Sequence, residues 1–200
     1  MGNMHAYSID TDERKNILLA LAIISIGFSW CFCQFIGACE ISLPWWVERP
    51  SVLFFYWLFF LIFDKLLWQY LKKLNFRKTP NLNGEWKGKL KSSFDSHSAE
   101  QKATLKISQT WTRIKILFTT DQSSSHSESA SIVIDAPEGK YLSYQYINEP
   151  RSNAIETMSI HRGTATLIFN EKKNTLEGQY YSGRGRQKFG SLHFVRGNVK

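Results

Sequence analysis

Two long apolar runs in the first 72 residues constrain the fold of this 200-residue chain more than any other feature. The first run, 17–38, contains Gln34 as its only strongly polar residue. At ~1.5 Å per residue a helix of this length spans ~33 Å, enough for a hydrocarbon core of ~30 Å. Because Arg14 and Lys15 precede the run, a cleaved signal peptide is the alternative, but the run is long, lacks a convincing small-residue cleavage site and is followed closely by a second apolar run. We therefore expect a retained transmembrane helix over about 17–38.

The second apolar run predicts another transmembrane helix over about 50–70. Pro50 suits the first turn of a helix, where its missing N–H is not needed. Trp45 and Trp46 precede the run, and Trp68 and Tyr70 lie near its end, which matches aromatic belts at two headgroup levels. Residues 1–78 are therefore expected to form a membrane module.

The distribution of basic residues predicts the orientation of the two helices. The connection 40–50 holds only Arg49, whereas four basic residues follow the second helix: Lys72, Lys73, Arg77 and Lys78. Short loops rich in lysine and arginine stay on the cytoplasmic side of a membrane. Both termini are therefore expected in the cytoplasm, with the chain crossing the membrane twice.

Asp64 and Lys65 interrupt the second apolar run. Lys65 could extend toward the cytoplasmic headgroups and pair with Asp64, which would leave the interface undisturbed. In the other interpretation Asp64, ~10 Å from the cytoplasmic end, faces other helices or water when subunits cluster. The second interpretation makes Asp64 a candidate for oligomerisation in the membrane.

Residues 79–200 show the period-2 alternation of β-strands. In 84–91, Trp86 and Leu90 alternate with charged residues, and in 102–108 alanine, leucine and isoleucine alternate with polar ones. Turn residues separate the segments at 121–125, 135–139, 148–153, 171–174 and 183–186. Further strands are predicted at 111–119, 129–135, 140–148, 156–161, 164–170, 175–182 and 187–196. This succession predicts an antiparallel meander closed into a barrel of about eight strands, whose interior is filled or holds one small ligand.

Trp86 and Arg196 are predicted to close one end of this barrel. Trp86 follows a glycine at the start of the first predicted strand, and Arg196 ends the last, which resembles a lipocalin-like pattern. A guanidinium stacked on a large aromatic ring would seal the barrel floor. The alternative is an ordinary core tryptophan with an unrelated arginine.

Basic and aromatic residues gather at particular strands of a basic domain. Residues 79–200 hold 17 Lys and Arg against 11 Asp and Glu, so +6 of the net charge of +8 belongs here. Attraction to anionic lipid headgroups would explain such a charge by itself. Arginines also pair with phosphates and aromatic rings stack on bases, which suits a nucleotide ligand. The alternative is barrel wall and a solvated hairpin. The candidate ligand-binding residues are Tyr144, Tyr146, Arg151, Tyr180, Arg184 and Arg186.

No signature of catalysis or of a metal site occurs in the sequence. We find no phosphate-binding glycine loop, no nucleophile elbow and no HExxH motif, so an enzyme is not expected. Neither a cofactor nor a metal is expected, because zinc-spaced Cys and His clusters are missing. The three cysteines, Cys31, Cys33 and Cys39, lie in or beside the first helix and imply no disulfide framework.

Four segments together give the chain a resemblance to a known family. They are "NLNGEWKG" after the second apolar run, "HRGTATLIF", the hairpin "LEGQYYSGRGRQKFG" and the last-strand "LHFVR". With the two apolar runs, the layout resembles the two-transmembrane β-barrel effectors associated with CD-NTase enzymes in cyclic-oligonucleotide-based antiphage signalling systems (CBASS). The resemblance covers nearly the full chain.

The resemblance implies a barrel that senses a cyclic di- or trinucleotide made by a partner CD-NTase synthase during phage infection. It further implies that the membrane helices then self-associate and disrupt the bacterial inner membrane, so that the cell dies or stops growing. The partners would be the ligand, the bilayer and other copies of the chain, with no DNA or RNA polymer expected.

Two other functions remain open from the residues alone. One is a membrane-tethered lipocalin-like binder of a lipid, which would have an apolar barrel lining without convergent arginine or lysine. The other is a scaffold whose barrel binds another protein, which would have a solid core and no pocket.

Overall fold

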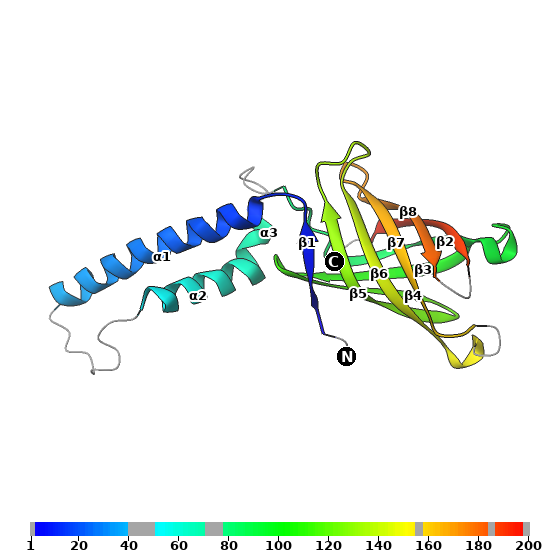
Figure 1. Ribbon diagram of the computed structural model, residues 1–200, viewed down its shortest axis with the longest axis horizontal. Coiled ribbons are helices and arrows are strands. Elements are labelled where there is room, and N and C mark those ends of the chain that lie inside the picture. The colour runs from blue at the N-terminus through cyan, green and yellow to red at the C-terminus, as the bar shows by residue number, and fades with distance from the viewer. Residues whose placement is uncertain (1–2, 40–50, 71–77, 155–157, 184–186, 198–200) are drawn as a thin grey trace. The chain divides into compact units, whose positions relative to one another are not determined.

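A computed structural model describes residues 3–39, 51–70, 78–154, 158–183 and 187–197 (Figure 1). The chain divides into two compact units, one of Thr11–Lys78 and one of Met1–Asp10 with Thr79–Lys200. The first unit is helical and the second is a β-barrel.

Helix α1 (Glu13–Ala38) begins one turn earlier than the apolar run, because the polar residues 13–16 continue the helix. Its buried residues, Leu21, Ser25 and Ser29, follow an i, i+4 row. The Ser25 hydroxyl donates to the Leu21 carbonyl at 2.6 Å, so its polar group is satisfied inside the helix. Small residues in such a row let a second helix approach closely.

The second apolar segment is a helix interrupted by one wide turn. Helix α2 (Val52–Ile62) is capped by Ser51, whose hydroxyl accepts from the Phe54 N–H at 3.3 Å. A π-helical turn, η1 (Phe63–Leu67), separates α2 from α3 (Trp68–Tyr70). Within η1, Asp64 is buried whereas Lys65 is exposed, so the two side chains face different surroundings.

Aromatic rings join α1 to α2. The Phe28 ring lies 4.8 Å from that of Phe55 and 5.3 Å from that of Phe59, both in edge-on geometry. The Phe32 and Phe55 rings are 5.5 Å apart. Both helical segments, 26 and 19 residues long, are apolar and long enough to cross a membrane.

Nine strands among the described residues form a closed barrel in the order β1-β4-β3-β2-β9-β8-β7-β6-β5. All pairings are antiparallel except that of β1 with β5. The strands are β1 (His5–Ile9), β2 (Gly84–Ser92), β3 (Gln101–Gln109), β4 (Arg113–Thr120), β5 (Ser123–Val133), β6 (Tyr141–Pro150), β7 (His161–Asn170), β8 (Thr175–Ser182) and β9 (Phe189–Arg196).

Strand β1 fills a gap between β4 and β5. These two strands pair with each other only over three residue pairs, beginning at Leu117 and His126, and then diverge. β1 pairs with β4 at His5 and with β5 from Tyr7 to Ile9. The Asp10 carboxylate then accepts the backbone N–H groups of 134 and 135 at 2.9 to 3.2 Å, which holds the end of β1 on β5. Residues 5–9 were expected to belong to the membrane module, and no strand was predicted there.

The predicted fold class is confirmed: two apolar helices precede an antiparallel barrel, with nine strands where about eight were expected. The strand predicted over 156–161 is not seen in its described part, because residues 158–160 have no regular structure and 155–157 lie outside the described residues. The turn predicted over 121–125 is shorter, since β5 already begins at Ser123. Trp45, Trp46 and Pro50, used above to delimit the second helix, also lie outside the described residues.

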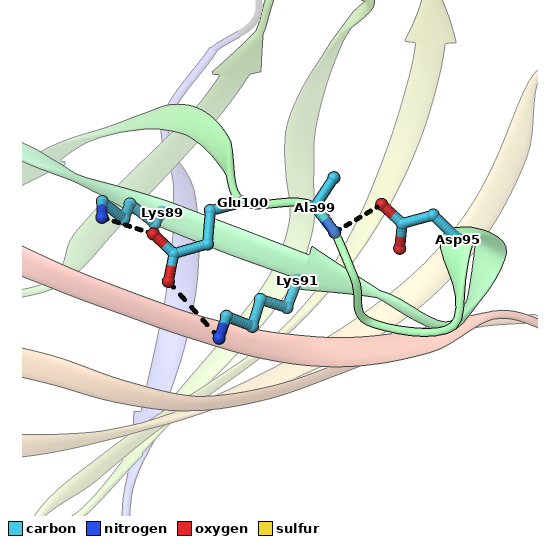
Figure 2. Close-up of polar contacts among 5 residues, drawn as sticks. All are labelled: Lys89, Lys91, Asp95, Ala99 and Glu100. Carbon is cyan, nitrogen blue, oxygen red and sulfur yellow. Dashed lines mark hydrogen bonds and ion pairs between the residues drawn. The ribbon is translucent and has the colours of Figure 1, made fainter.

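The outer surface of β2 and β3 carries a cluster of charges around Glu100. Figure 2 shows the Glu100 carboxylate between two lysines; it pairs with Lys89 and lies 3.4 Å from the Lys91 ammonium. The hydrogen bonds from Lys89 and then Lys91 hold the pKa of Glu100 below its usual value of 4.5.

Removing both lysines should raise the pKa of Glu100. Because its pKa is lowered on folding, Glu100 favours the folded state above its ordinary pKa, and this contribution is lost as the pH falls through the lowered value. We expect the carboxyl titration midpoint, followed by NMR, to move up toward 4.5 in Lys89→Gln/Lys91→Gln. Lys102→Gln, which removes a neighbouring lysine that forms no pair with Glu100 among the described contacts, is the control. An unchanged midpoint in the double variant would contradict the assigned cause.

Candidate functional site

A cavity of about 250 Å³ opens at one end of the barrel. It lies where β2, β4, β6 and β8 end and where β3, β5, β7 and β9 begin. The wall combines aromatic and aliphatic side chains with many hydroxyl and amide groups. Its lining residues are Leu90, Ser92, Phe94, Gln101, Phe118, Thr120, Gln122, Ser123, Ser125, Tyr144, Tyr146, Asn148, Met158, His161, Ala165, Tyr180, Ser182, Lys188 and Leu192.

Hydroxyl and amide groups in the cavity are held in place by one another. The Ser125 hydroxyl donates to the Asn148 side-chain oxygen at 2.7 Å, and both residues are buried. Across the cavity mouth the Tyr180 hydroxyl donates to Ser92 Oγ at 2.9 Å. Pre-positioned polar groups of this kind can recognise the edges of a polar ligand with little loss of side-chain entropy.

Tyr144 and Tyr146 form a pair of rings on β6, with centroids 6.1 Å apart. Burial, with a smaller effect of Tyr146, raises the pKa of the Tyr144 phenol well above its ordinary value. The phenol therefore stays neutral at physiological pH, and it can present a hydroxyl group and an aromatic face.

Lys188 and His161 are the lining residues that carry or can acquire positive charge, among the described residues. The Lys188 ammonium lies 5.7 Å from the centre of the Phe94 ring, a cation–π distance. The His161 Nδ1 is 2.9 Å from the Ser159 carbonyl oxygen. The lining residues within the described ranges include no aspartate or glutamate, which suits an anionic or neutral polar ligand.

The structure brings only part of the sequence-predicted site together. Tyr144, Tyr146 and Tyr180 all line the cavity. Arg151 is exposed and is not a lining residue. Arg184 and Arg186 lie outside the described residues.

Sequence reasoning missed the small polar lining residues. Ser123 and Ser125 recur at a spacing of two, which places both on the inner face of β5. Their alternation was the available signal, but the serine-rich composition of 121–125 suggested a turn instead. Asn148 and Lys188 were likewise passed over, because Asn148 sat at a predicted strand end and Lys188 stood beside two arginines.

The opposite end of the barrel is closed by Trp86 and Arg196. The Arg196 guanidinium lies 4.8 Å from the centre of the Trp86 ring and donates to the carbonyls of Asn81 and Asn83 at 2.8 and 2.6 Å. The fully buried Trp86 donates its indole N–H to the Leu82 carbonyl at 3.0 Å. Burial lowers the pKa of Arg196 from its ordinary value, but a guanidinium remains charged in proteins.

The side chain of Gln109 ties two chain segments together at this closed end. Its amide oxygen accepts from the Leu82 N–H at 2.9 Å, and its amide nitrogen donates to the Pro80 carbonyl at 3.2 Å and the Tyr7 hydroxyl at 3.1 Å. Tyr7 belongs to β1, which leads to α1, and 80–82 follow the second apolar helix in sequence. Gln109 therefore links both segments that connect the barrel with the helices.

Replacing Gln109 with leucine should destabilise the barrel. The change leaves the buried Leu82 N–H without its acceptor, and an unsatisfied buried group costs ~1–3 kcal/mol. We expect the free energy of unfolding to fall by about this amount in a denaturant melt of the full chain in detergent. Gln145→Leu, on the exposed face of β6, is the matched control. Equal stability of Gln109→Leu and the control would show that the link is dispensable.

No group of three or more His, Cys, Asp or Glu side chains that could hold a metal ion occurs among the described residues. Cys31, Cys33 and Cys39 are exposed free thiols on or next to α1.

The fold and cavity define a class: a β-barrel with a sealed floor and a polar, open mouth, in a chain with two helices apolar enough to cross a membrane. Comparison with known proteins identifies the family within this class. A family model described as the Cap15 cyclic dinucleotide receptor domain matches residues 77–196, well over half of the chain. The chain belongs to this family, and the CBASS resemblance found in the sequence is confirmed.

Two curated relatives carry the name CD-NTase-associated protein 15. The protein from Yersinia aleksiciae is 36 % identical over 141 residues, which cover 67 % of this chain and 64 % of the relative. The protein from Staphylococcus schleiferi is 30 % identical over 122 residues, which cover 60 % of this chain and 64 % of the relative. In both, the matched region thus spans slightly less than two thirds of the relative's length.

Proposed function

We propose that this chain is a CBASS effector whose barrel binds a cyclic dinucleotide in the cavity at its open mouth. The observation that carries the proposal is the polar cavity inside the domain that matches the receptor family, whose described lining residues include no carboxylate. An interior of this kind weighs against the scaffold alternative, for which a solid core was expected. Its hydroxyls, amide and lysine weigh against a lipid binder, for which an apolar lining was expected.

The cavity residues have the chemistry that a cyclic dinucleotide requires. The faces of Tyr144 and Tyr146 can stack on bases, and Asn148 and Ser125 can read base or ribose edges by hydrogen bonds. Lys188 can pair with a phosphate. Tyr180 lines the cavity, and Arg151, Arg184 and Arg186 remain proposed ligand contacts. A cyclic trinucleotide is the other ligand to be tested.

We propose that ligand binding makes the membrane helices self-associate and disrupt the bacterial inner membrane. Both termini of the chain would lie on the cytoplasmic side of that membrane. The chain would act by transduction without catalysis, on a messenger supplied by a linked CD-NTase synthase. Asp64 supports the proposed self-association of the helices. A buried carboxylate in an apolar segment disfavours membrane insertion, and such residues are usually retained for a function. Asp64 also lies in a π-helical turn, a feature often found at functional sites.

Vesicle leakage tests this function directly. The full chain is reconstituted into vesicles loaded with a self-quenched dye, and cyclic dinucleotides, cyclic trinucleotides or a linear dinucleotide are added. We expect one cyclic nucleotide to release the dye and the linear dinucleotide to have no effect. Leakage that is the same with every nucleotide, or absent with all of them, would contradict the proposal.

Replacing Lys188 with glutamine should weaken binding. A hydrogen bond to a charged group contributes ~1.5–3 kcal/mol, so the loss of one phosphate contact should raise Kd roughly ten- to a hundredfold. The measurement is calorimetric titration of the full chain in detergent with the cyclic nucleotide that causes leakage. Lys172→Gln, an equal change of charge in the exposed β7–β8 turn, should leave Kd unchanged. Equal affinities of the two variants for the ligand would show that Lys188 does not contact it.

A further inference from the structure

The outer surface of the barrel is strongly polarised in charge. Strands β2, β3 and β4 present seven basic residues and one acidic residue, Glu85, at exposed or half-buried positions. Strands β5 to β8 present three acidic residues and one basic residue, Arg162. We call the first surface the basic wall; its members are Lys87, Lys89, Lys91, Lys102, Lys106, Arg113 and Lys115.

Only part of the basic wall is neutralised by neighbouring carboxylates. Glu100 pairs with Lys89 and Lys91, as Figure 2 shows, and Glu85 lies 3.5 Å from the Lys87 ammonium. The described ion pairs include none for the other four members, Lys102, Lys106, Arg113 and Lys115. Lys106 lies directly opposite Glu85 on β2, so the unbalanced positive charge is that of Lys102, Arg113 and Lys115.

One cross-strand pair of the wall places two like charges opposite each other. Lys89 and Lys102 are directly opposite each other on neighbouring antiparallel strands. Like charges in this register repel and destabilise a sheet, and such a surface attracts anionic partners from solution. The barrel core does not need these charges, because the inward positions of the same strands are apolar, as at Trp86, Leu105 and Ile116.

We infer that the basic wall is a docking surface for an anionic lipid bilayer. The occupant follows from charge complementarity and from the chain itself, which carries helices able to cross a membrane. Only residues 10–12 separate β1 from α1, and three residues reach ~11 Å at most. A membrane-inserted α1 thus keeps the barrel close to the lipid headgroups, where each lysine or arginine gains attraction to the anionic surface. The inference does not depend on the ligand of the cavity.

Contact with lipid should be visible as protection of the wall lysines. The full chain is reconstituted in phosphatidylcholine vesicles with or without phosphatidylglycerol, and lysines are labelled with an amine-reactive reagent and read by mass spectrometry. Lys102 and Lys106 should label more slowly in the anionic vesicles, and high salt should restore their rate.

Removing one lysine of the basic wall tests whether its charge contributes to lipid contact. Lys102→Gln should lower the equilibrium constant for contact about fivefold, which corresponds to ~1 kcal/mol, as seen from the remaining protection of Lys106. Arg162→Gln removes one positive charge from the exposed surface of β7, outside the wall, and should leave that protection intact. Equal labelling of the wall in neutral and anionic vesicles would overturn the inference. So would protection in neutral vesicles by an added oligonucleotide, which would assign the wall to a nucleic acid.

Discussion

Replacing Trp86 with alanine is expected to lower the free energy of unfolding of the barrel by ~3–5 kcal/mol. Trp86 is fully buried, its ring meets that of Phe169 edge-on at 6.0 Å, and its indole N–H is bonded to the Leu82 carbonyl. The truncation leaves a large cavity at the floor and removes the ring on which the Arg196 guanidinium is stacked. The half-buried cation would then lose its aromatic partner as well.

The measurement is a thermal melt of the full chain in detergent, followed by the circular dichroism of the β-sheet. Trp57→Ala, which truncates an exposed tryptophan of α2, is the matched control and should leave the barrel transition in place. Arg196→Met, which keeps some of the packing, should fall between the two. A transition of Trp86→Ala that coincides with wild type would refute the role of the Trp86 floor in stability.

Replacing Asp64 with leucine is expected to abolish ligand-dependent leakage while membrane insertion and ligand affinity persist. Asp64 interrupts an apolar segment six residues before its end at Tyr70, and an ionisable group within a transmembrane helix disfavours insertion, so leucine should favour it. The variant should lose leakage because its helices associate less strongly, since a polar side chain can form hydrogen bonds between helices of different subunits. Leakage from vesicles holding equal amounts of each protein measures the effect.

Two controls make the Asp64 result specific. Lys65→Leu removes the neighbouring charge at an exposed position and should retain leakage. Flotation of the vesicles with Asp64→Leu checks insertion, and calorimetric titration checks the receptor. Full leakage by an Asp64→Leu protein that is inserted in the membrane would refute the proposed role of Asp64 in oligomerisation.

Most of the fold follows from two periodicities of the sequence. Long apolar runs determine the helices, and alternation such as that of Trp86, Gly88 and Leu90 determines the strands and their inward faces. β1 was out of reach because five residues, with Tyr7 alone buried, are too few to show an alternating pattern. The π-helical turn at 63–67 was equally hidden, since a single wide turn does not alter an apolar composition.

The candidate site was only partly predictable, because it is assembled by strand pairing. Tyr144 and Tyr146 could be placed inside from their spacing of two. The Ser125 and Asn148 pair comes from the register of β5 on β6, which a single sequence does not reveal. Arg151 was chosen by residue type, because a guanidinium suits a phosphate; it is exposed and does not line the cavity, so its contact with a ligand stays a prediction.

Filling the cavity tests most directly the claim that it is the receptor site. Ala165 lines the cavity on β7 and faces Tyr144 and Tyr180 on the two neighbouring strands, so tryptophan at this position should occupy the space that a ligand needs. Thr164→Trp, on the exposed outer face of the same strand, is the matched control. Near-ultraviolet circular dichroism establishes that each variant is folded, and the full chain in detergent is titrated calorimetrically with cyclic dinucleotides. We predict saturable binding to wild type and Thr164→Trp and none to Ala165→Trp. Undiminished binding to a folded Ala165→Trp protein, or no binding of any cyclic dinucleotide to wild type, would contradict the account.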